Sequence, residues 1–178
     1  RKPLNRAFYE QMAKDAPGAP VAIAASGAWI RTHDADFAWL QRQARTGALA
    51  LSWVNHSDRH PYRPGAPETQ NYLMLPGFDL DAEIFATEKL LIGRGETPSV
   101  FFRFPGLVAD AALMGRLAAR HLVALGADAW LALGQPARPG AVVLVHGNGN
   151  ERAGVALFSR AVGRKTMPQP FRRIEDAP

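Results

Sequence analysis

Apolar and polar positions alternate along this chain in the pattern that repeated β/α units produce. Short apolar runs that predict buried strands occupy residues 21–25, 49–54, 99–102, 130–133 and 141–145. Apolar residues at helical spacing predict helices between Asn5 and Pro17 and over residues 36–46, 79–91, 109–125 and 152–162. This order predicts an α/β fold, with parallel strands in an open sheet or a barrel and helices outside.

Polar segments with functional residue types come directly after three of the predicted strands. Residues 56–60 contain two histidines and follow the second strand, Arg103 follows the third, and His146 follows the last. In parallel α/β folds, catalytic and binding residues lie just past the C-terminal ends of the strands. We therefore expect these imidazole and guanidinium groups to gather on one face of the molecule.

The composition limits the classes of function. The 178 residues suffice for one domain with a substantial core. The absence of cysteine excludes disulfides and cysteine-ligated metals, and it leaves the compartment open. The net charge of +5 comes mostly from scattered residues without a nucleic-acid-binding motif, so we expect no nucleic-acid partner. No run reaches the roughly 18 apolar residues of a membrane span, and no signal peptide is visible at Arg1.

His56 and His60 are candidate metal ligands. On a helical turn, their spacing of four would place both imidazoles on one side, where they could share a metal such as zinc. A carboxylate and a water would then complete a hydrolytic site. The alternative is a pair of solvated histidines in a polar loop, with Asp58 between them facing solvent or capping the turn.

Four further residues allow a catalytic and a structural interpretation. Arg103 could orient a carboxylate base through a bidentate pair, or lie exposed at a turn. His146 could be a general acid or a metal ligand, or a satisfied histidine at the rim of the core. Asp128 and Trp130 could line the same rim, or be a loop acid and a core aromatic. The glycine-rich residues 147–151 lack both the P-loop ending and the G-x-G-x-x-G spacing, which disfavours nucleotide binding.

Taken together, these segments resemble the polysaccharide deacetylase family, also called the NodB-homology domain or carbohydrate esterase family 4. Residues 55–61, N-H-S-D-R-H-P, are similar to its second motif, N-H-[ST]-x-x-H-P. Residues 103–106, R-F-P-G, resemble the third motif, usually R-P-P-Y. Residues 128–130 resemble the weakly defined fourth motif, and residues 144–146 resemble the fifth, L-x-H.

The resemblance covers residues 1–158 and implies the family's deformed (β/α) barrel. Residues 21–25 align with the second strand of that barrel, so we expect the first strand to be missing or to lie upstream of residue 1. We expect one NodB-like domain over residues 1–164 and a polar C-terminal tail over residues 165–178. A periplasmic or secreted location is implied by the resemblance alone.

The resemblance also implies roles for single residues. His56 and His60 would bind a divalent metal, most often zinc, with cobalt, nickel or manganese as alternatives. Arg103 would orient the catalytic aspartate, Asp128 would pair with that arginine, and His146 would be the general acid. Gly106 replaces the family tyrosine, which removes the aromatic groove wall but keeps the backbone N–H that contacts the oxyanion. The implied substrate-binding residues are Pro105, Gly106, Trp130 and Leu144.

The family's first motif, an aspartate pair that supplies the general base and the third metal ligand, has no match in this sequence. We expect these two acids just upstream of Arg1. The implied activity is metal-dependent removal of N- or O-acetyl groups from a carbohydrate or polysaccharide. Two alternatives stay open: a non-catalytic carbohydrate-binding relative with the same fold, and a metal hydrolase of other non-peptide C–N bonds.

Overall fold

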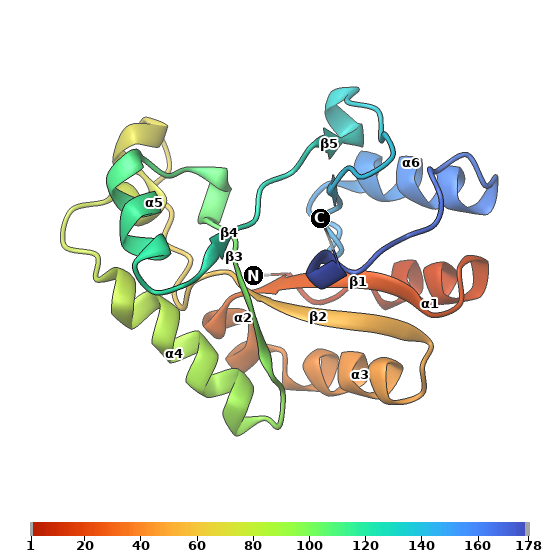
Figure 1. The fold of residues 1–178 in the computed structure, drawn as a ribbon, viewed down its shortest axis with the longest axis horizontal. Coiled ribbons are helices and arrows are strands. Elements are labelled where there is room, and N and C mark those ends of the chain that lie inside the picture. The colour runs from red at the N-terminus through yellow and green to blue at the C-terminus, as the bar shows by residue number, and fades with distance from the viewer. Residues whose placement is uncertain (1, 177–178) are drawn as a thin grey trace. The chain divides into compact units, whose positions relative to one another are not determined.

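A computed structural model describes residues 2–176 of the chain and contains parallel strands with helices beside them (Figure 1). The strands are β1 (Ala19–Ala25), β2 (Leu49–Asn55), β3 (Pro98–Phe102), β4 (Val123–Ala124), β5 (Ala129–Trp130) and β6 (Val143–Leu144). The α-helices are α1 (Arg6–Asp15), α2 (Gly27–Thr32), α3 (Asp34–Arg45), α4 (Leu80–Gly93), α5 (Ala111–Ala118) and α6 (Arg152–Gly163). The short 3-10 helices are η1 (Glu68–Gln70), η2 (Tyr72–Met74), η3 (Pro105–Leu107), η4 (Leu131–Leu133) and η5 (Ile174–Asp176).

The strands form two sheets. One has the order β1-β2-β3-β4, and β3 runs parallel to both of its neighbours; the other is the parallel pair β5-β6. The predicted α/β class with parallel strands and outer helices is therefore confirmed. None of the helices in the described residues is long and apolar enough to span a membrane.

The described chain divides into two compact units. The first contains residues up to Val21, then His33–Leu51, then residues from Ala127 onward; the second contains Ala22–Thr32 and Ser52–Gly126. Both predicted histidine ligands and Arg103 belong to the second unit, whereas His146 belongs to the first. The prediction of a single domain over residues 1–164 stays a prediction.

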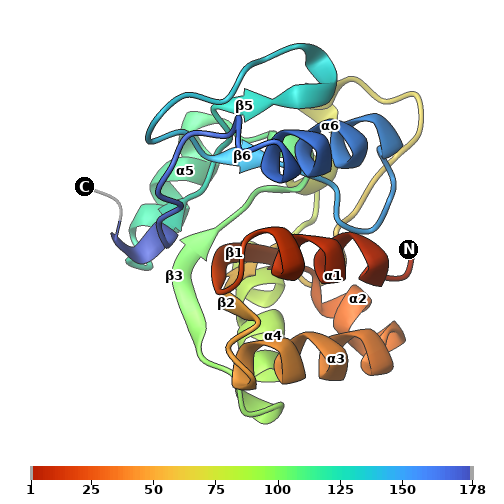
Figure 2. The same cartoon turned by 90° about the vertical axis from the view of Figure 1, so that its right-hand side faces the viewer.

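The first unit is built around the packed helices α1 and α6, which lie side by side in Figure 2. Asn5 caps α1 as predicted, because its side-chain oxygen accepts the Phe8 N–H at 3.3 Å. The Phe8 ring packs edge-on against Phe158 of α6 at 5.9 Å between centroids. In the segment predicted as a polar tail, Met167 is buried.

The second unit has its own apolar core beside β3 and β4. Side chains of η2, α4, β3 and α5 meet there with little or no exposure to solvent. These buried residues are Leu73, Leu80, Ile84, Phe102, Phe104, Leu113 and Leu117. Asp79 caps α4 by accepting backbone N–H groups of its first turn, so the helix begins at Leu80 and not at Asp79.

The predicted helix over residues 109–125 is wrong in its C-terminal part. Helix α5 ends at Ala118, and a turn follows in which His121 has a left-handed backbone (φ 57°). Residues 123–124 then extend as β4, parallel to β3, and the Leu125 N–H bonds to the Phe102 carbonyl at 2.9 Å. The pairing with β3 satisfies backbone groups that a longer helix would have paired locally.

The predicted buried strand over residues 141–145 is also only partly correct. Strand β6 contains two residues, and the whole segment is half-buried. Its partner β5 is equally short, because the chain turns into η4 directly after Trp130. An apolar run therefore indicated the strand but overstated its length and its burial.

Candidate functional site

The His56 and His60 side chains lie next to each other in the loop after β2. Their ring centroids are 4.7 Å apart and the rings meet edge to face at 76°. The helical turn expected for this spacing is wrong, since residues 56–60 form an irregular loop. Ser57 (φ 63°) and His60 (φ 48°) both have left-handed backbones, and these reversals bring the two imidazoles together.

Buried side chains of the loop and its strand hold this backbone. The Asn55 side chain accepts the Ser57 N–H at 3.0 Å and donates to the Ile84 carbonyl at 2.9 Å. The Ser57 hydroxyl then accepts the His60 N–H at 3.0 Å. Left-handed backbone costs a non-glycine residue about 1–2 kcal/mol, and these hydrogen bonds offset that cost. The motif residues Asn55 and Ser57 therefore position the histidines.

Glu83 of α4 also holds the histidine loop in place, a role that the sequence did not reveal. Its carboxylate is 1% exposed and accepts the backbone N–H groups of Asp58 and Arg59 at 3.0 and 2.9 Å. The Arg59 guanidinium binds the other carboxylate oxygen. Its place in the first turn of a helix also favours the negative charge. Glu83 thus fixes the loop from an element 24 residues away.

Replacing Glu83 with alanine should destabilise the protein and loosen the histidine loop. Removing one partner of a buried charged network costs about 3 kcal/mol, which corresponds to a fall of about 10 °C in the unfolding midpoint of a chain of this size. Thermal unfolding by circular dichroism measures this. Glu10→Ala, at an exposed position on α1, should leave the midpoint unchanged. Equal midpoints for the two variants would contradict the role of Glu83.

The protonation of His56 is set by a backbone carbonyl. Its Nδ1 lies 2.7 Å from the Arg103 carbonyl oxygen, which can only accept a hydrogen bond. In the neutral imidazole, Nδ1 therefore carries the proton and Nε2 carries the lone pair. Metal-binding histidines have this arrangement, in which the second ring nitrogen donates to a carbonyl or carboxylate. The donor set at His56 thus fits a metal such as zinc.

Arg103 leaves β3 with its side chain buried and only partly paired. Its Nη1 donates to the Gly126 carbonyl at 3.1 Å, while Nη2 is buried without a hydrogen-bond partner among residues 2–176. Burial lowers the pKa of Arg103, because the charged guanidinium loses its hydration. A buried cation of this kind is stabilised by a carboxylate, which fits the predicted role in orienting an acid.

Two acids near the histidines, Asp58 and Glu83, already bind other groups. Asp58 pairs with both terminal nitrogens of Arg31 at 2.8 and 3.0 Å, and Glu83 binds the loop amides. In the part of the chain that the structure describes, no three His, Asp or Glu side chains gather as a metal site. The third ligand expected upstream of Arg1 lies outside the described residues.

Pro105 and Gly106 follow Arg103 in η3. Pro105 is buried, and Gly106 has φ 65°. A Cβ on Gly106 would lie 2.4 Å from the Tyr72 ring, far inside van der Waals contact. Glycine suits this position, because its backbone is left-handed and it leaves room for the Tyr72 ring. A tyrosine here, as in the family motif, would displace that ring.

The remaining predicted residues gather in the first unit. Trp130 and Leu144 are register partners in the β5-β6 pair, and the Trp130 ring lies 5.5 Å from the His146 ring. Glu151 accepts the Trp130 indole N–H at 2.8 Å and lies 3.5 Å from His146 Nδ1, within ion-pair range. Asp128 accepts the Val142 N–H at 2.8 Å and so ties β5 to the segment entering β6. Its pairing with the predicted arginine stays a prediction.

The structure thus brings the predicted residues together in two groups. His56, His60, Arg103, Pro105 and Gly106 lie in the second unit, and Asp128, Trp130, Leu144 and His146 lie in the first. Convergence of the two groups into one site stays a prediction. Glu83 was not identified as a site residue from the sequence, because it acts through contacts 24 and 25 residues away.

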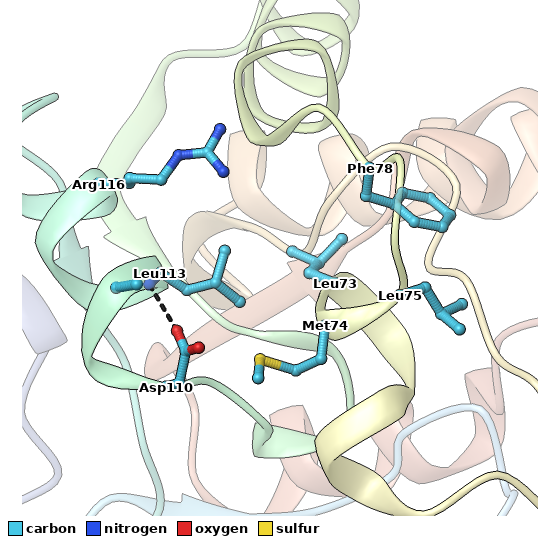
Figure 3. Close-up of a pocket in the computed structure, with 8 residues that line it drawn as sticks. Leu73, Met74, Leu75, Phe78, Asp110, Leu113 and Arg116 are labelled. Atoms are coloured by element: carbon cyan, nitrogen blue, oxygen red, sulfur yellow. Dashed lines mark hydrogen bonds between the residues drawn. The ribbon is translucent and has the colours of Figure 1, made fainter.

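A surface pocket of about 230 Å³ lies elsewhere in the second unit (Figure 3). Apolar side chains line it together with Asp110 and Arg116, and Asp110 is engaged in capping α5 through the Leu113 N–H at 2.7 Å. Its lining residues are Leu73, Met74, Leu75, Phe78, Asp110, Ala112, Leu113 and Arg116. None of the predicted site residues is among them.

Solved structures of carbohydrate esterases have the same fold. A family 4 carbohydrate esterase from Streptomyces lividans, solved with acetate, is 17% identical and matches 97% of this chain and 88% of its own, with a TM-score of 0.61. A family 4 carbohydrate esterase from Bacillus anthracis is 16% identical and matches 98% of this chain and 75% of its own, with a TM-score of 0.67.

A third match is a mutant of a family 4 pseudoenzyme in which enzymatic activity was restored. It is 11% identical and matches 89% of this chain and 59% of its own, with a TM-score of 0.53. No family model matches the sequence. The chain thus has the fold of the family 4 carbohydrate esterases, as predicted, and at these identities the comparison establishes the fold alone.

Proposed function

We propose that this protein is a metal-dependent hydrolase that removes acetyl groups from N-acetylated or O-acetylated carbohydrate. The observation that carries the proposal is the His56–His60 pair, with centroids 4.7 Å apart and the His56 Nδ1 proton directed at the Arg103 carbonyl. Such orientation of an imidazole is typical of metal ligation. The fold shared with enzymes of this activity supports the same conclusion.

His56 and His60 would hold the metal, most often zinc, together with an aspartate from outside the described residues. When bound, the metal would supply a Lewis acid that polarises the acetyl carbonyl and acidifies water. Arg103, with its buried and unpaired Nη2, would orient a second aspartate as the general base. The backbone N–H of Gly106 would donate to the oxyanion.

In the same proposal, His146 is the general acid that gives a proton to the leaving amine or alcohol. The Glu151 carboxylate, 3.5 Å from Nδ1, would orient the imidazole. Trp130 and Leu144, adjacent in the β5-β6 pair, would line the acetyl pocket, and Pro105 would form part of the groove wall. Asp128 would pair with Arg103.

A non-catalytic carbohydrate-binding protein is the second candidate. One observation favours it: one protein of the same fold is a pseudoenzyme. A metal hydrolase of other C–N bonds shares the chemistry of the first candidate and differs in substrate.

Hydrolysis by the full-length, zinc-loaded protein distinguishes the three candidates, measured as acetate release from the carbohydrates and as ring opening of the amide. N-acetylglucosamine oligomers, acetylated xylan and a small cyclic amide are compared under the same conditions, before and after chelation and with zinc restored. We expect release from a carbohydrate substrate, loss on chelation, and recovery with zinc. Saccharide binding without hydrolysis would indicate the binding protein, and hydrolysis of the small amide alone would indicate the other hydrolase.

A further inference from the structure

Tyr72 fills the space beside Gly106 that a side chain at position 106 would occupy. An ideal Cβ on Gly106 would lie 2.4 Å from Cε2 and Cζ of Tyr72 and 2.9 Å from its hydroxyl. The two residues come from η2 and η3, which pack together. An aromatic ring is therefore present beside Gly106, although it comes from a position 34 residues earlier in the chain.

The backbone around Tyr72 is fixed in this position. Asn71 is 2% exposed, and its side chain accepts the N–H groups of Arg63 and Tyr72, each at 2.9 Å. It also donates to the Arg63 carbonyl at 2.8 Å. Tyr72 itself has φ 52°, a left-handed backbone that these bonds support. The ring is thus presented by an ordered segment.

The Tyr72 ring also contacts His60 of the histidine pair and a second tyrosine, Tyr62. Its centroid is 6.1 Å from that of His60, edge to face at 84°, and 5.5 Å from that of Tyr62, tilted at 37°. Tyr62 is 60% exposed and Tyr72 is half-buried.

We propose that Tyr72 and Tyr62 form an aromatic platform that binds a pyranose ring of the substrate beside the histidine pair. This inference rests on the proposed function and deepens it, because it names the part of the substrate that is recognised. The C–H face of a pyranose is apolar and packs on aromatic rings, whereas its edge of hydroxyls accepts and donates hydrogen bonds. A tilted pair of neighbouring tyrosine rings suits the apolar face of such a ring.

The platform is tested by binding of an N-acetylglucosamine tetramer to the full-length, zinc-loaded protein. Titration calorimetry in a His146→Ala background avoids turnover during the measurement. Tyr72→Asn is the main variant, because asparagine tolerates the left-handed backbone at this position. Tyr72→Phe keeps the ring, and Phe85→Ala removes another exposed aromatic, carried by α4, as the matched control.

We expect Tyr72→Asn to raise the Kd for the tetramer about tenfold. Tyr72→Phe should stay within about twofold of the reference, since stacking dominates. Zinc affinity should be unchanged in both variants, and Phe85→Ala should bind the tetramer normally.

Three results would overturn the platform: no tetramer binding by the reference protein, an unchanged Kd in Tyr72→Asn, or a loss in Tyr72→Phe as large as in Tyr72→Asn. If Tyr72→Asn binds normally while the wild type releases acetate, the platform fails and the proposed hydrolase stands. If binding depends on Tyr72 while the wild type releases no acetate from any substrate, the platform stands and the hydrolase fails.

Discussion

Replacing His56 with alanine is expected to abolish metal binding and acetate release together. Removing a residue that only supports a metal ligand costs about 10–100-fold in affinity, so losing a ligand should cost more. The metal contributes several kcal/mol to the transition state, and turnover should fall by about a thousandfold or more. Zinc affinity by calorimetry and acetate release by a coupled assay measure the two effects on one preparation.

Two further variants make this result specific. His60→Asn should behave like His56→Ala while preserving the backbone, since asparagine tolerates the left-handed conformation found there. His121→Asn is the matched control, because His121 is exposed and also has a left-handed backbone (φ 57°). Normal zinc affinity in His56→Ala would refute the histidine pair as a metal site.

Replacing His146 with alanine should reduce turnover without weakening metal or substrate binding. A general acid contributes about 10²–10⁴-fold to the rate, and the reduction should fall on kcat and not on KM. The size of the reduction in kcat should also depend on the leaving group. An amine must be protonated to leave, whereas 4-nitrophenolate leaves as an anion and needs no proton from His146.

Comparing an N-acetylglucosamine oligomer with 4-nitrophenyl acetate therefore separates general-acid catalysis from a structural effect. His146→Ala should lose activity on the oligomer and retain most of it on the activated ester. A parallel loss on both substrates would instead indicate that His146 supports the fold of the β5-β6 segment. In His56→Ala, by contrast, both activities should disappear, because the proposed mechanism makes both depend on the metal.

Much of the fold was predictable from the sequence, because its signals are local. Asn5 and Asp79 each cap a helix through backbone groups two or three residues away. The apolar spacing of α3 corresponds to Phe37 and Leu40, both fully buried. Caps and one-sided apolar spacing lie within a few residues of each other, so a single sequence contains them completely.

The errors arose where pairing between distant strands decided the structure. Residues 123–124 continue an amphipathic pattern, yet they pair with Phe101 and Phe102 of β3. Residues 143–144 end a strongly apolar run, yet they form a two-residue strand beside β5. Strand pairing depends on which segment lies alongside, and an apolar run carries no information about that partner.

The sequence by itself determined the residue types and their order: two histidines after β2, an arginine after β3 and a histidine after β6. Only the tertiary structure decided how two of them meet, through left-handed backbones at Ser57 and His60 that Glu83 stabilises from α4. It also decided that Tyr72 stands beside Gly106. The physical reason is the range of the interactions. Chemistry is a property of each side chain, whereas a loop conformation is stabilised by groups that folding brings from distant parts of the chain.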